Sequence, residues 1–441
     1  MLSVLRNSWP LLLGVMLLMV GNGMQGTLLG IRGEIENIST YQMSVVMSAY
    51  FLGFLFGSRL TPELIRRVGH VRVFAALGSL ISAVLILYAT APNWVAWTAM
   101  RVLIGFSFSG VYITAESWLN ASSTNETRGQ TLSAYMIVQA IGIIGAQLLM
   151  NTGDPSGYFL FVIPSVLVSV AFTPILLSAA PAPPFETTQR MSFARLFAAS
   201  PLGCVGMFLM GGVFSALFGM ASVWGTRAGL SVREISAFVA AIYVGGLLFQ
   251  YPIGWASDRM DRRLLILGLA AAGALAMALV FVTDPGFGVL LVMAVLIGGI
   301  ANPIYSLLLA YTNDYLDNSD MASASAGLLF INGLGAITGP IVTGWLMEAV
   351  GDGGFFLYIG LLMAAISGYA GWRMTRRAGL PTEQTGAFAV LSPSATMFAV
   401  EVALEAAQDL PHTDPLPTET GTGTGTETET GTKTQPEPEG H

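Results

Sequence analysis

Residues 264–283, LLILGLAAAGALAMALVFVT, are twenty consecutive positions without a charged side chain. A helix of about 20 apolar residues is long enough to cross the roughly 30 Å of hydrocarbon in a bilayer. Eleven other stretches have a comparable length and composition, so we predict an all-α membrane protein with twelve transmembrane helices, over residues 9–31, 41–60, 71–91, 94–118, 129–150, 157–180, 201–226, 232–256, 264–283, 287–312, 322–347 and 354–374.

The composition of the whole chain agrees with this prediction. Of 441 residues, 54% are hydrophobic and only 10% carry a charge, whereas a soluble domain has about 25% charged residues. The formal net charge of −7 is unevenly distributed. Ten acidic residues and one lysine follow residue 378, which gives this tail −9 and leaves +2 for residues 1–377. Neither part is a natural partner for nucleic acid.

The arginines predict the orientation of the spans. If the N-terminus is cytoplasmic, fourteen arginines fall on the cytoplasmic side and three on the opposite side. Because basic residues are enriched on the cytoplasmic side of membrane proteins, we expect both termini there and an even number of spans.

The chain divides into two halves of six spans. We predict an N-terminal bundle over 1–180, a cytoplasmic loop over 181–200, a C-terminal bundle over 201–377, and a cytoplasmic acidic tail over 378–441. RVGH at 67–70 recurs as RMDR at 259–262, 192 residues later, and SWL at 117–119 recurs as DYL at 314–316, 197 residues later. Two pseudo-symmetric bundles of this kind are typical of transporters built from repeats.

The tail has a different character from the bundles. Residues 411–441 are mostly Pro, Thr, Gly and Glu, including GTGTGTETETGT, and this composition cannot bury enough apolar surface to fold. We therefore expect a disordered, low-complexity tail. Residues 394–408 could form an amphipathic helix that rests on the membrane bundle, or a simple linker.

Arg101 is the most informative polar residue within a span. It lies about seven residues, or about 10 Å, from the outer end of the fourth span. A buried arginine costs several kcal/mol in a membrane, so it should face a partner or a water-filled cavity. A stripe about 80° wide on the same helix holds Arg101, Gly105, Ser109, Tyr112 and Glu116. Arg101 and Glu116 are about 22 Å apart along the helix and cannot form an ion pair.

Four other spans also have one polar face. Each amide alone could simply join two helices, but five such faces are better explained by a shared hydrated path. Glu116 is in addition our candidate for proton coupling. The candidates for a substrate cavity are Asn22, Gln25, Arg101, Tyr112, Glu116, Gln139, Asn302, Tyr305 and Asn332.

Enzymatic and metal-dependent functions are disfavoured. The single cysteine, Cys204, excludes a disulfide framework within the chain. The three histidines, His70, His412 and His441, are far apart in sequence, so we expect no metal site, no cofactor and no catalytic triad.

Two motifs resemble the major facilitator superfamily of secondary transporters. Residues 254–263, GWASDRMDRR, are similar to its loop pattern G-x-x-x-D-R-x-x-R-R, and Arg101-x-x-x-Gly105-x-x-x-x-Gly110 is similar to its fourth-span pattern. The resemblance covers residues 1–377 and implies that Asp258, Arg259 and Arg263, with Arg67 in the first half, form a cytoplasmic gate. It points to a bacterial inner-membrane protein, but to no particular substrate.

The first-half copy of the loop departs from the family pattern. Pro62 replaces the glycine, Arg66 replaces the acid and His70 replaces a basic residue, although Glu63 could substitute for the acid. The fifth span has GIIGA at 142–146 in place of the Gly-Pro pair of the family's drug antiporters, which weighs against proton-driven drug antiport.

We therefore predict a monomeric secondary transporter that moves a small-molecule solute by alternating access. Proton coupling and facilitated diffusion both remain open, and Arg101 favours a solute with a negative group. The alternative is a non-transporting receptor or scaffold that recruits partners through its acidic tail. Deletion of residues 382–441 separates the two, because only a scaffold should lose its activity.

Overall fold

The computed structural model describes residues 2–121, 123–176 and 191–377, and ten positions in the following segment. These ten positions are 379, 381, 385, 386, 388, 391, 396, 399, 400 and 403. Residues 1–409 form one compact unit and Leu410–His441 form a second. The second unit lies outside the described residues, and so does the sequence prediction made for residues 411–441.

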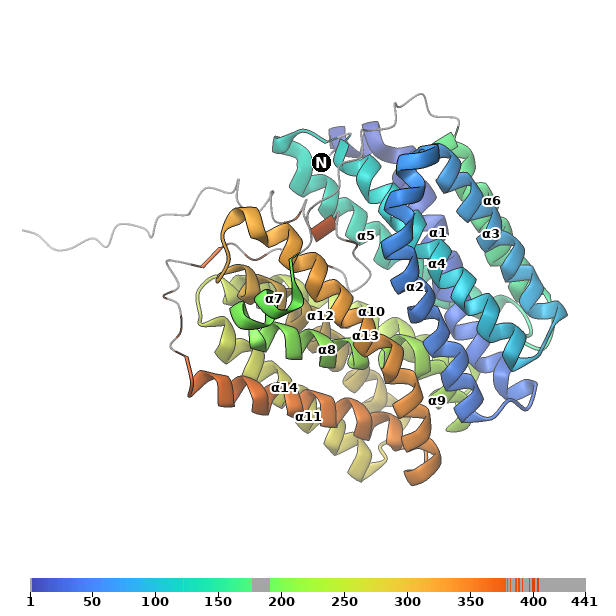
Figure 1. Ribbon diagram of the computed structural model, residues 1–441. Coiled ribbons are helices and arrows are strands. Elements are labelled where there is room, and N and C mark those ends of the chain that lie inside the picture. Colours follow the sequence, from blue (N-terminus) through green and yellow to red (C-terminus); the bar gives the residue numbers. More distant parts are fainter. Residues whose placement is uncertain are drawn as a thin grey trace, which may run out of the picture. The chain divides into compact units, whose positions relative to one another are not determined.

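All regular elements among the described residues are helices. The first half contains α1 (Leu2–Ile35), α2 (Thr40–Val68), α3 (His70–Thr90), α4 (Trp94–Ala121), α5 (Asn125–Leu149), the short 3₁₀ helix η1 (Met150–Thr152) and α6 (Phe159–Leu176). The second half contains α7 (Phe193–Ala199), α8 (Pro201–Ser215), the π-helix η2 (Ala216–Met220), α9 (Ala221–Arg227), α10 (Val232–Ser257), α11 (Arg262–Thr283), α12 (Phe287–Asn313), α13 (Asn318–Val350) and α14 (Gly354–Met374). Figure 1 shows these helices as two groups.

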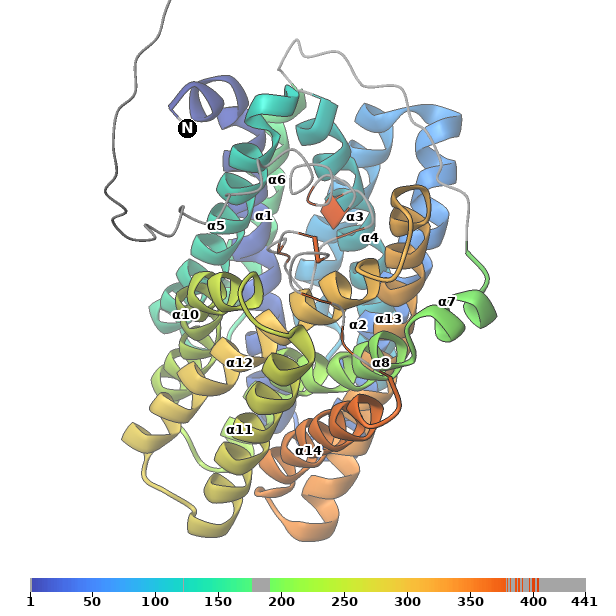
Figure 2. The same ribbon diagram turned by 90° about the vertical axis from the view of Figure 1, so that its left-hand side faces the viewer.

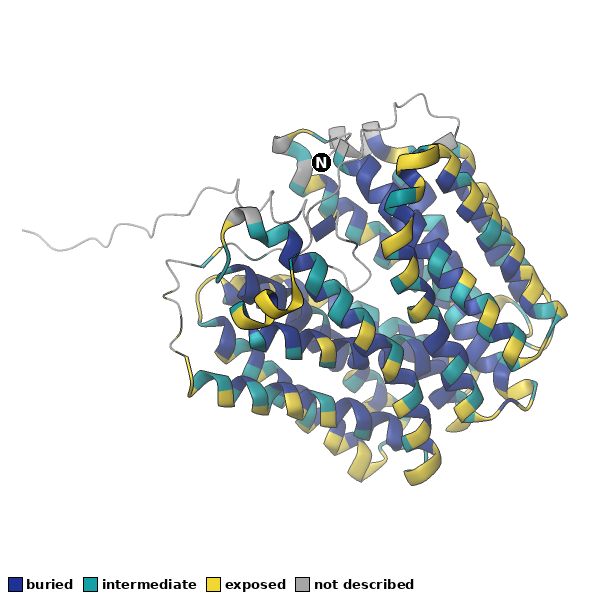
Figure 3. Ribbon diagram, in the orientation of Figure 1, coloured by how far each residue is buried: buried dark blue, intermediate teal, exposed yellow. Residues whose placement is uncertain are grey.

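Eleven of the twelve predicted spans are confirmed as helices that are long and apolar enough to cross a membrane. The seventh span is continuous through α8, η2 and α9. The sixth, predicted over 157–180, corresponds to the shorter apolar helix α6, and its last four residues lie outside the described part of the chain. Figure 3 shows exposed positions along the outward-facing sides of the helices, where hydrocarbon can cover them. Leu275 and Val282 are among the exposed apolar residues.

The helices α2 and α10 begin with the same N-terminal capping motif. Ser39 accepts a hydrogen bond from the Gln42 backbone, and the Gln42 side chain bonds back to the Ser39 backbone. Ser231 and Glu234 form the same capping box at the start of α10. Capping boxes satisfy backbone N–H groups that a helix start would leave unpaired. The two boxes are 192 residues apart, as the predicted repeat requires.

The main helix crossings also recur. Where α2 crosses α4, a Cβ atom on Gly53 or Gly105 would lie 2.0 or 1.9 Å from a carbonyl oxygen of the partner helix. Where α10 crosses α12, a Cβ atom on Gly245 or Gly298 would likewise lie 1.9 or 2.0 Å from a carbonyl oxygen of the partner helix. Only glycine permits this approach of two backbones. Gly245 follows Gly53 by 192 residues, and Gly298 follows Gly105 by 193 residues. The helix packing therefore follows the internal repeat of the sequence.

The two halves meet along α1 with α9, α2 with α13, and α5 with α10. We call the end of the bundle that carries the α2–α3 and α10–α11 loops the inner end, and the opposite end the outer end. At the outer end, the Tyr41 backbone N–H donates to Glu348 Oε1 at 2.9 Å, and Arg227 Nη1 donates to Thr40 Oγ1 at 2.9 Å. These hydrogen bonds join the two halves on that side.

Candidate functional site

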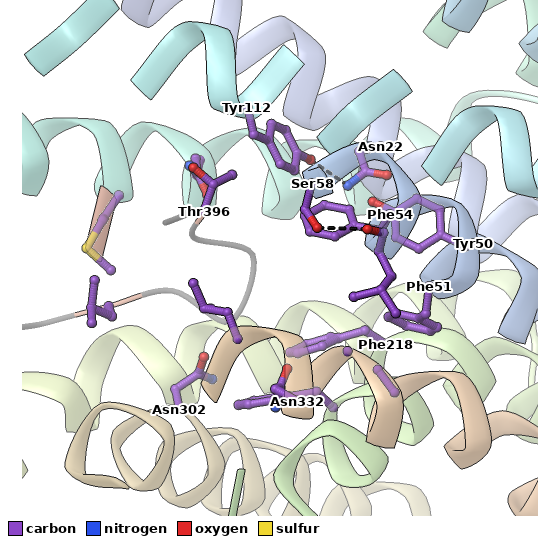
Figure 4. Close-up of a pocket in the computed structure, with 18 of the residues that line it drawn as sticks. Asn22, Tyr50, Phe51, Phe54, Ser58, Tyr112, Phe218, Asn302, Asn332 and Thr396 are labelled. Atoms are coloured by element: carbon purple, nitrogen blue, oxygen red, sulfur yellow. Dashed lines mark hydrogen bonds between the residues drawn. The ribbon is translucent and has the colours of Figure 1, made fainter. Parts of the chain in front are cut away.

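A cavity of about 1120 Å³ lies between the two halves. Its walls come from α1, α2, α4 and α5 on one side, and from α8, η2, α10, α12 and α13 on the other. Figure 4 shows Asn22, Tyr50 and Tyr112 of the first half opposite Phe218, Asn302 and Asn332 of the second. Arg59, Pro62 and Ser192 also line it, so the cavity reaches the inner end of the bundle.

Four of the predicted residues form one chain of hydrogen bonds on the first-half wall. Arg101 Nη1 donates to Gln25 Oε1 at 2.5 Å, and Gln25 Nε2 donates to Asn22 Oδ1 at 3.0 Å. Asn22 Nδ2 then donates to the Tyr112 hydroxyl oxygen at 2.8 Å. All four side chains line the cavity. The polar faces of α1 and α4 therefore join into a single stripe along the cavity wall.

Arg101 has an unusual environment for a cation. Its side chain is buried, and its guanidinium carbon lies 5.0 Å from the centre of the Tyr50 ring. Its Nη2 lies 3.0 Å from Met47 Sδ. Among the described residues no carboxylate forms an ion pair with Arg101, and its buried Nε has no hydrogen-bond partner. Arg101 thus places a positive charge on the cavity wall, with no ion-paired carboxylate among the described residues.

The two predicted amides of the second-half wall, Asn302 and Asn332, bond to helix backbones. Asn302 Nδ2 donates to Gly298 O and Asn332 Nδ2 donates to Met207 O, both at 3.0 Å. Both side chains line the cavity, as does Gln139 from α5. Tyr305 is buried beside this wall and is not among the described lining residues; its hydroxyl has no partner within the described part of the chain.

Aromatic rings from both halves enter the cavity. The Phe218 ring lies 4.7 Å from Tyr243 and 5.8 Å from Phe214, measured between ring centres. Tyr50 and Phe54 are 6.2 Å apart on the first-half wall. Phe218 belongs to the π-helix η2, and single π turns are frequent at functional sites. The sequence did not single out these rings, because aromatic residues in apolar spans do not stand out from their neighbours.

Glu116 was predicted to line the main cavity, but it is not among the described lining residues and lies next to a second, smaller pocket. It is buried, and Oε1 accepts a hydrogen bond of 2.8 Å from the Tyr135 hydroxyl. Oε2 accepts hydrogen bonds from the backbone N–H, at 3.2 Å, and the hydroxyl of Thr396. The small pocket is lined by Glu116, Tyr135 and Ala399 among others. The carboxyl is therefore held by neutral donors.

The predicted gate residues lie at the inner end in different settings. Asp258 Oδ1 accepts a hydrogen bond of 2.9 Å from the Phe388 backbone and is 3.8 Å from Arg262 Nη2. Arg259 is stacked over Trp255, 4.3 Å from the ring centre. Arg67 pairs with Glu63 at 2.7 Å on the exposed surface of α2.

Arg263 pairs with Asp261 at 2.6 Å and donates a hydrogen bond of 2.7 Å to the Arg377 carbonyl oxygen. Partial burial acts to raise the pKa of Asp261, but the hydrogen bonds and charge of Arg263 outweigh it and hold this pKa below its ordinary value.

The strongest ion pair at this end was not among the predicted gate residues. Arg262 Nη1 contacts both carboxylate oxygens of Asp314, at 2.6 and 2.7 Å, and both side chains are buried. The sequence signals for it were the place of Arg262 in the loop pattern and the recurrence of Ser117 as Asp314 in the second half. No group of three or more potential metal ligands occurs among the residues that the structure describes.

Comparison with known proteins gives the family. The model of the Major Facilitator Superfamily matches residues 11–241 and 203–408. The chain belongs to the major facilitator superfamily. Among similar proteins, an uncharacterised MFS-type transporter of Enterobacter sp. (strain 638) is 27% identical over 357 residues, which cover 79% of this chain and 91% of the relative. The uncharacterised MFS-type transporter YcaD of Escherichia coli (strain K12 / DH10B) gives the same identity and coverage.

Solved transporter structures have a fold similar to that of this chain. The nucleoside transporter NupG has a TM-score of 0.69 at 17% identity, covering 84% of this chain and 99% of NupG. A bacterial homologue of the human lysosomal transporter Spinster, in an inward-facing conformation, has a TM-score of 0.63 at 13% identity, covering 92% and 98%. At these identities the likeness shows the fold alone. Family and fold together indicate an integral membrane transport protein and do not favour the scaffold alternative.

Proposed function

We propose that this protein is a secondary transporter that moves a small solute through the central cavity by alternating access. The observation that carries the proposal is a single cavity with walls from both halves, which reaches the inner end while hydrogen bonds join the halves at the outer end. In transporters built from repeats, substrates bind at the repeat interface and the halves rock around them. The arginine distribution favours a cytoplasmic inner end, and the proposal therefore assigns this structure to an inward-facing state.

The test begins with a substrate screen. Purified protein is screened for compounds that raise its melting temperature, because a ligand that binds only the folded state stabilises it. Each such compound is then offered to proteoliposomes. We expect at least one to be taken up or exchanged by the protein but not by empty liposomes. Binding compounds that never cross the membrane would contradict the proposal.

The cavity chemistry favours a solute with an anionic group and an apolar or aromatic body. Arg101 supplies a buried cation without an ion-paired carboxylate among the described residues, and Phe218 and Tyr243 supply aromatic surface on the opposite wall. Phenylacetate, phenylacetamide and benzylamine share an aromatic ring but differ in charge. We expect stabilisation in the order phenylacetate, phenylacetamide, benzylamine, and loss of this order in Arg101→Gln. The same order in that variant would exclude Arg101 as the anion-binding residue.

We further propose that Glu116 carries the coupled proton. It is a buried carboxyl in the span that also carries Arg101, and the described groups that bond to it, from Tyr135 and Thr396, are neutral. We expect Glu116→Gln to abolish uptake driven by a pH gradient while exchange of substrate continues. Asp284→Asn, at an exposed carboxyl directly after α11, is the control and should leave both activities unchanged. Uptake by Glu116→Gln that keeps its pH dependence would remove Glu116 from the mechanism.

A further inference from the structure

The chain returns to the inner end of the cavity after α14. We call the described residues from Gly379 to Ala403 the C-terminal strap. Leu391, Thr396, Ala399, Val400 and Ala403 are all buried, with at most 4% of their surface exposed. Figure 2 shows the red pieces of the strap among the helices, beside α4. The strap is therefore packed inside the bundle, where a surface linker would not be.

The first part of the strap is attached to the second half around the α10–α11 loop and at the end of α12. The Gly386 backbone N–H donates to Asp314 Oδ1 at 3.1 Å, and its carbonyl oxygen accepts from Arg262 Nη2. The Phe388 backbone N–H donates to Asp258 at 2.9 Å. The Phe388 ring lies over Gly254, where a Cβ atom would be only 2.7 Å from the ring. Phe388 of the strap thus contacts both Gly254 and Asp258 of the loop motif.

The middle of the strap enters the cavity. Leu391 N–H donates to Ser306 Oγ at 3.2 Å, and the Ser306 hydroxyl is 3.3 Å from the Leu391 carbonyl oxygen. Ser306 also accepts a hydrogen bond of 3.1 Å from Gln250 of α10. Leu391 and Thr396 are lining residues of the cavity. Part of the cavity wall at this end is therefore supplied by the strap.

The last part of the strap is attached to the first half. The Thr396 backbone N–H and hydroxyl both donate to Glu116 Oε2. Ala399 lies beside the same carboxyl and, with Tyr135, lines the small pocket around it. Hydrogen bonds to a carboxylate are stronger than those between neutral groups. The strap consequently connects Asp258 and Asp314 of the second half to Glu116 of the first half.

We propose that the inner mouth of the cavity is a binding site for the chain's own C-terminal strap, which blocks solute entry and holds the halves in one relative position. The proposal rests on the proposed function, in which this cavity is the substrate site. The strap follows α14 directly, so its effective concentration at the mouth is on the order of millimolar or higher. A solute arriving from the inner side has to displace it, and a change in the distance between the halves has to break its contacts at one end.

Accessibility of the cavity from the inner end tests the strap without any knowledge of the substrate. In a Cys204→Ala background, Asn302→Cys places one thiol in the cavity wall, and a membrane-impermeant maleimide is applied in inside-out vesicles. Two variants remove the strap contacts: truncation after Arg377, and the double substitution Leu391→Asp with Thr396→Ala. Truncation after Asp409 is the matched control, because it removes the second compact unit and keeps the strap.

We expect the labelling rate of Asn302→Cys to rise about tenfold or more when the strap contacts are removed, which corresponds to release of a mostly closed state. The control truncation should label at the rate of the full-length chain. Equal labelling of all four proteins would overturn the proposal.

A second measurement covers the case in which the truncated chain does not fold. Ser306→Cys with Leu391→Cys, in the Cys204→Ala background, should be joined by a short bifunctional thiol crosslinker in the full-length protein, because the Leu391 backbone nitrogen lies 3.2 Å from Ser306 Oγ. Absence of this crosslink contradicts the strap position. Neither the crosslink nor the labelling rate depends on transport. If both results are as expected but no compound is transported, the proposed function is contradicted while the position of the strap is not.

Discussion

The α2–α3 loop and the α10–α11 loop occupy equivalent places in the two halves, but they are held by different chemistry. His70 and Arg262 are separated by 192 residues and each begins a helix, α3 or α11. In the first half, His70 Nε2 lies 3.1 Å from the Ser117 hydroxyl of α4. In the second half, Arg262 contacts Asp314, at the end of α12, through two hydrogen bonds. A neutral hydrogen bond in one repeat is thus replaced by an ion pair in the other.

The ion pairs near the two loops also differ in their exposure to solvent. The Arg262 and Asp314 side chains are 2% and 5% exposed, whereas Arg66 and Arg67, which pair with Glu63 in the first half, are 66% and 71% exposed. Exposed ion pairs contribute little because water and salt screen them, while loss of one partner from a buried pair leaves an unpaired buried charge. In the described part of the chain, a buried ion pair therefore holds the loop motif only in the second half. The strap is attached to that half through the same charged residues.

The largest expected effect is on the second-half ion pair. Removal of one member of a buried pair costs about 3–5 kcal/mol, so Arg262→Ala should lower the melting temperature of the purified protein markedly. Arg259→Ala, at an exposed neighbouring arginine stacked on Trp255, is the matched control and should have a small effect. If the two variants melt at the same temperature, the second-half loop is not held by its charges and the comparison fails.

An intermediate effect is expected in the first half. Ser117→Ala removes the hydroxyl that contacts His70 and leaves the remaining packing of α4 in place. Loss of a neutral hydrogen bond costs about 1 kcal/mol, so the decrease in melting temperature should be clearly smaller than for Arg262→Ala. An equal or larger decrease would show that the neutral contact is as important as the ion pair.

The smallest effect is expected on the exposed first-half charges. Glu63→Gln removes the acid that pairs with Arg66 and Arg67 on the surface of α2. Because these charges are hydrated and screened, the melting temperature should not change measurably at low or moderate salt. A large decrease that disappears at high salt would show that the first-half loop also has a significant charge network.

The sequence predicted those features that depend on local patterns. Long runs without charge gave eleven of the spans, and the spacing of polar residues placed Arg101 and Tyr112 on one face of α4. Gln25 and Asn22 could be expected on a polar face of α1, and the structure bonds them to that face of α4. The sixth span is shorter than predicted over its described residues, and α6 contains Pro164 and Pro174, which weaken a helix without changing its hydropathy.

Other features depend on contacts between distant segments and leave little trace in a single sequence. Helical spacing indicates the face of a residue but not its neighbour, so Glu116 was expected to line the main cavity although it contacts Tyr135 and Thr396 instead. Tyr305 likewise lies beside the cavity lining. The strap binds mainly through backbone groups of Gly386, Phe388 and Leu391, and backbone groups are the same in every sequence.

The most direct test of alternating access is a pair of distance measurements at equivalent positions of the repeat. Spin labels at Tyr41 and Arg233 report on the outer end, and labels at Val68 and Met260 report on the inner end; each pair is exposed and separated by 192 residues. Both pairs are measured by double electron–electron resonance in proteoliposomes, in the Cys204→Ala background, with each compound that raises the melting temperature. A transporter predicts reciprocal changes, in which the outer distance lengthens as the inner distance shortens. If both distances stay fixed with every binding compound, or if both change in the same direction, the account is contradicted.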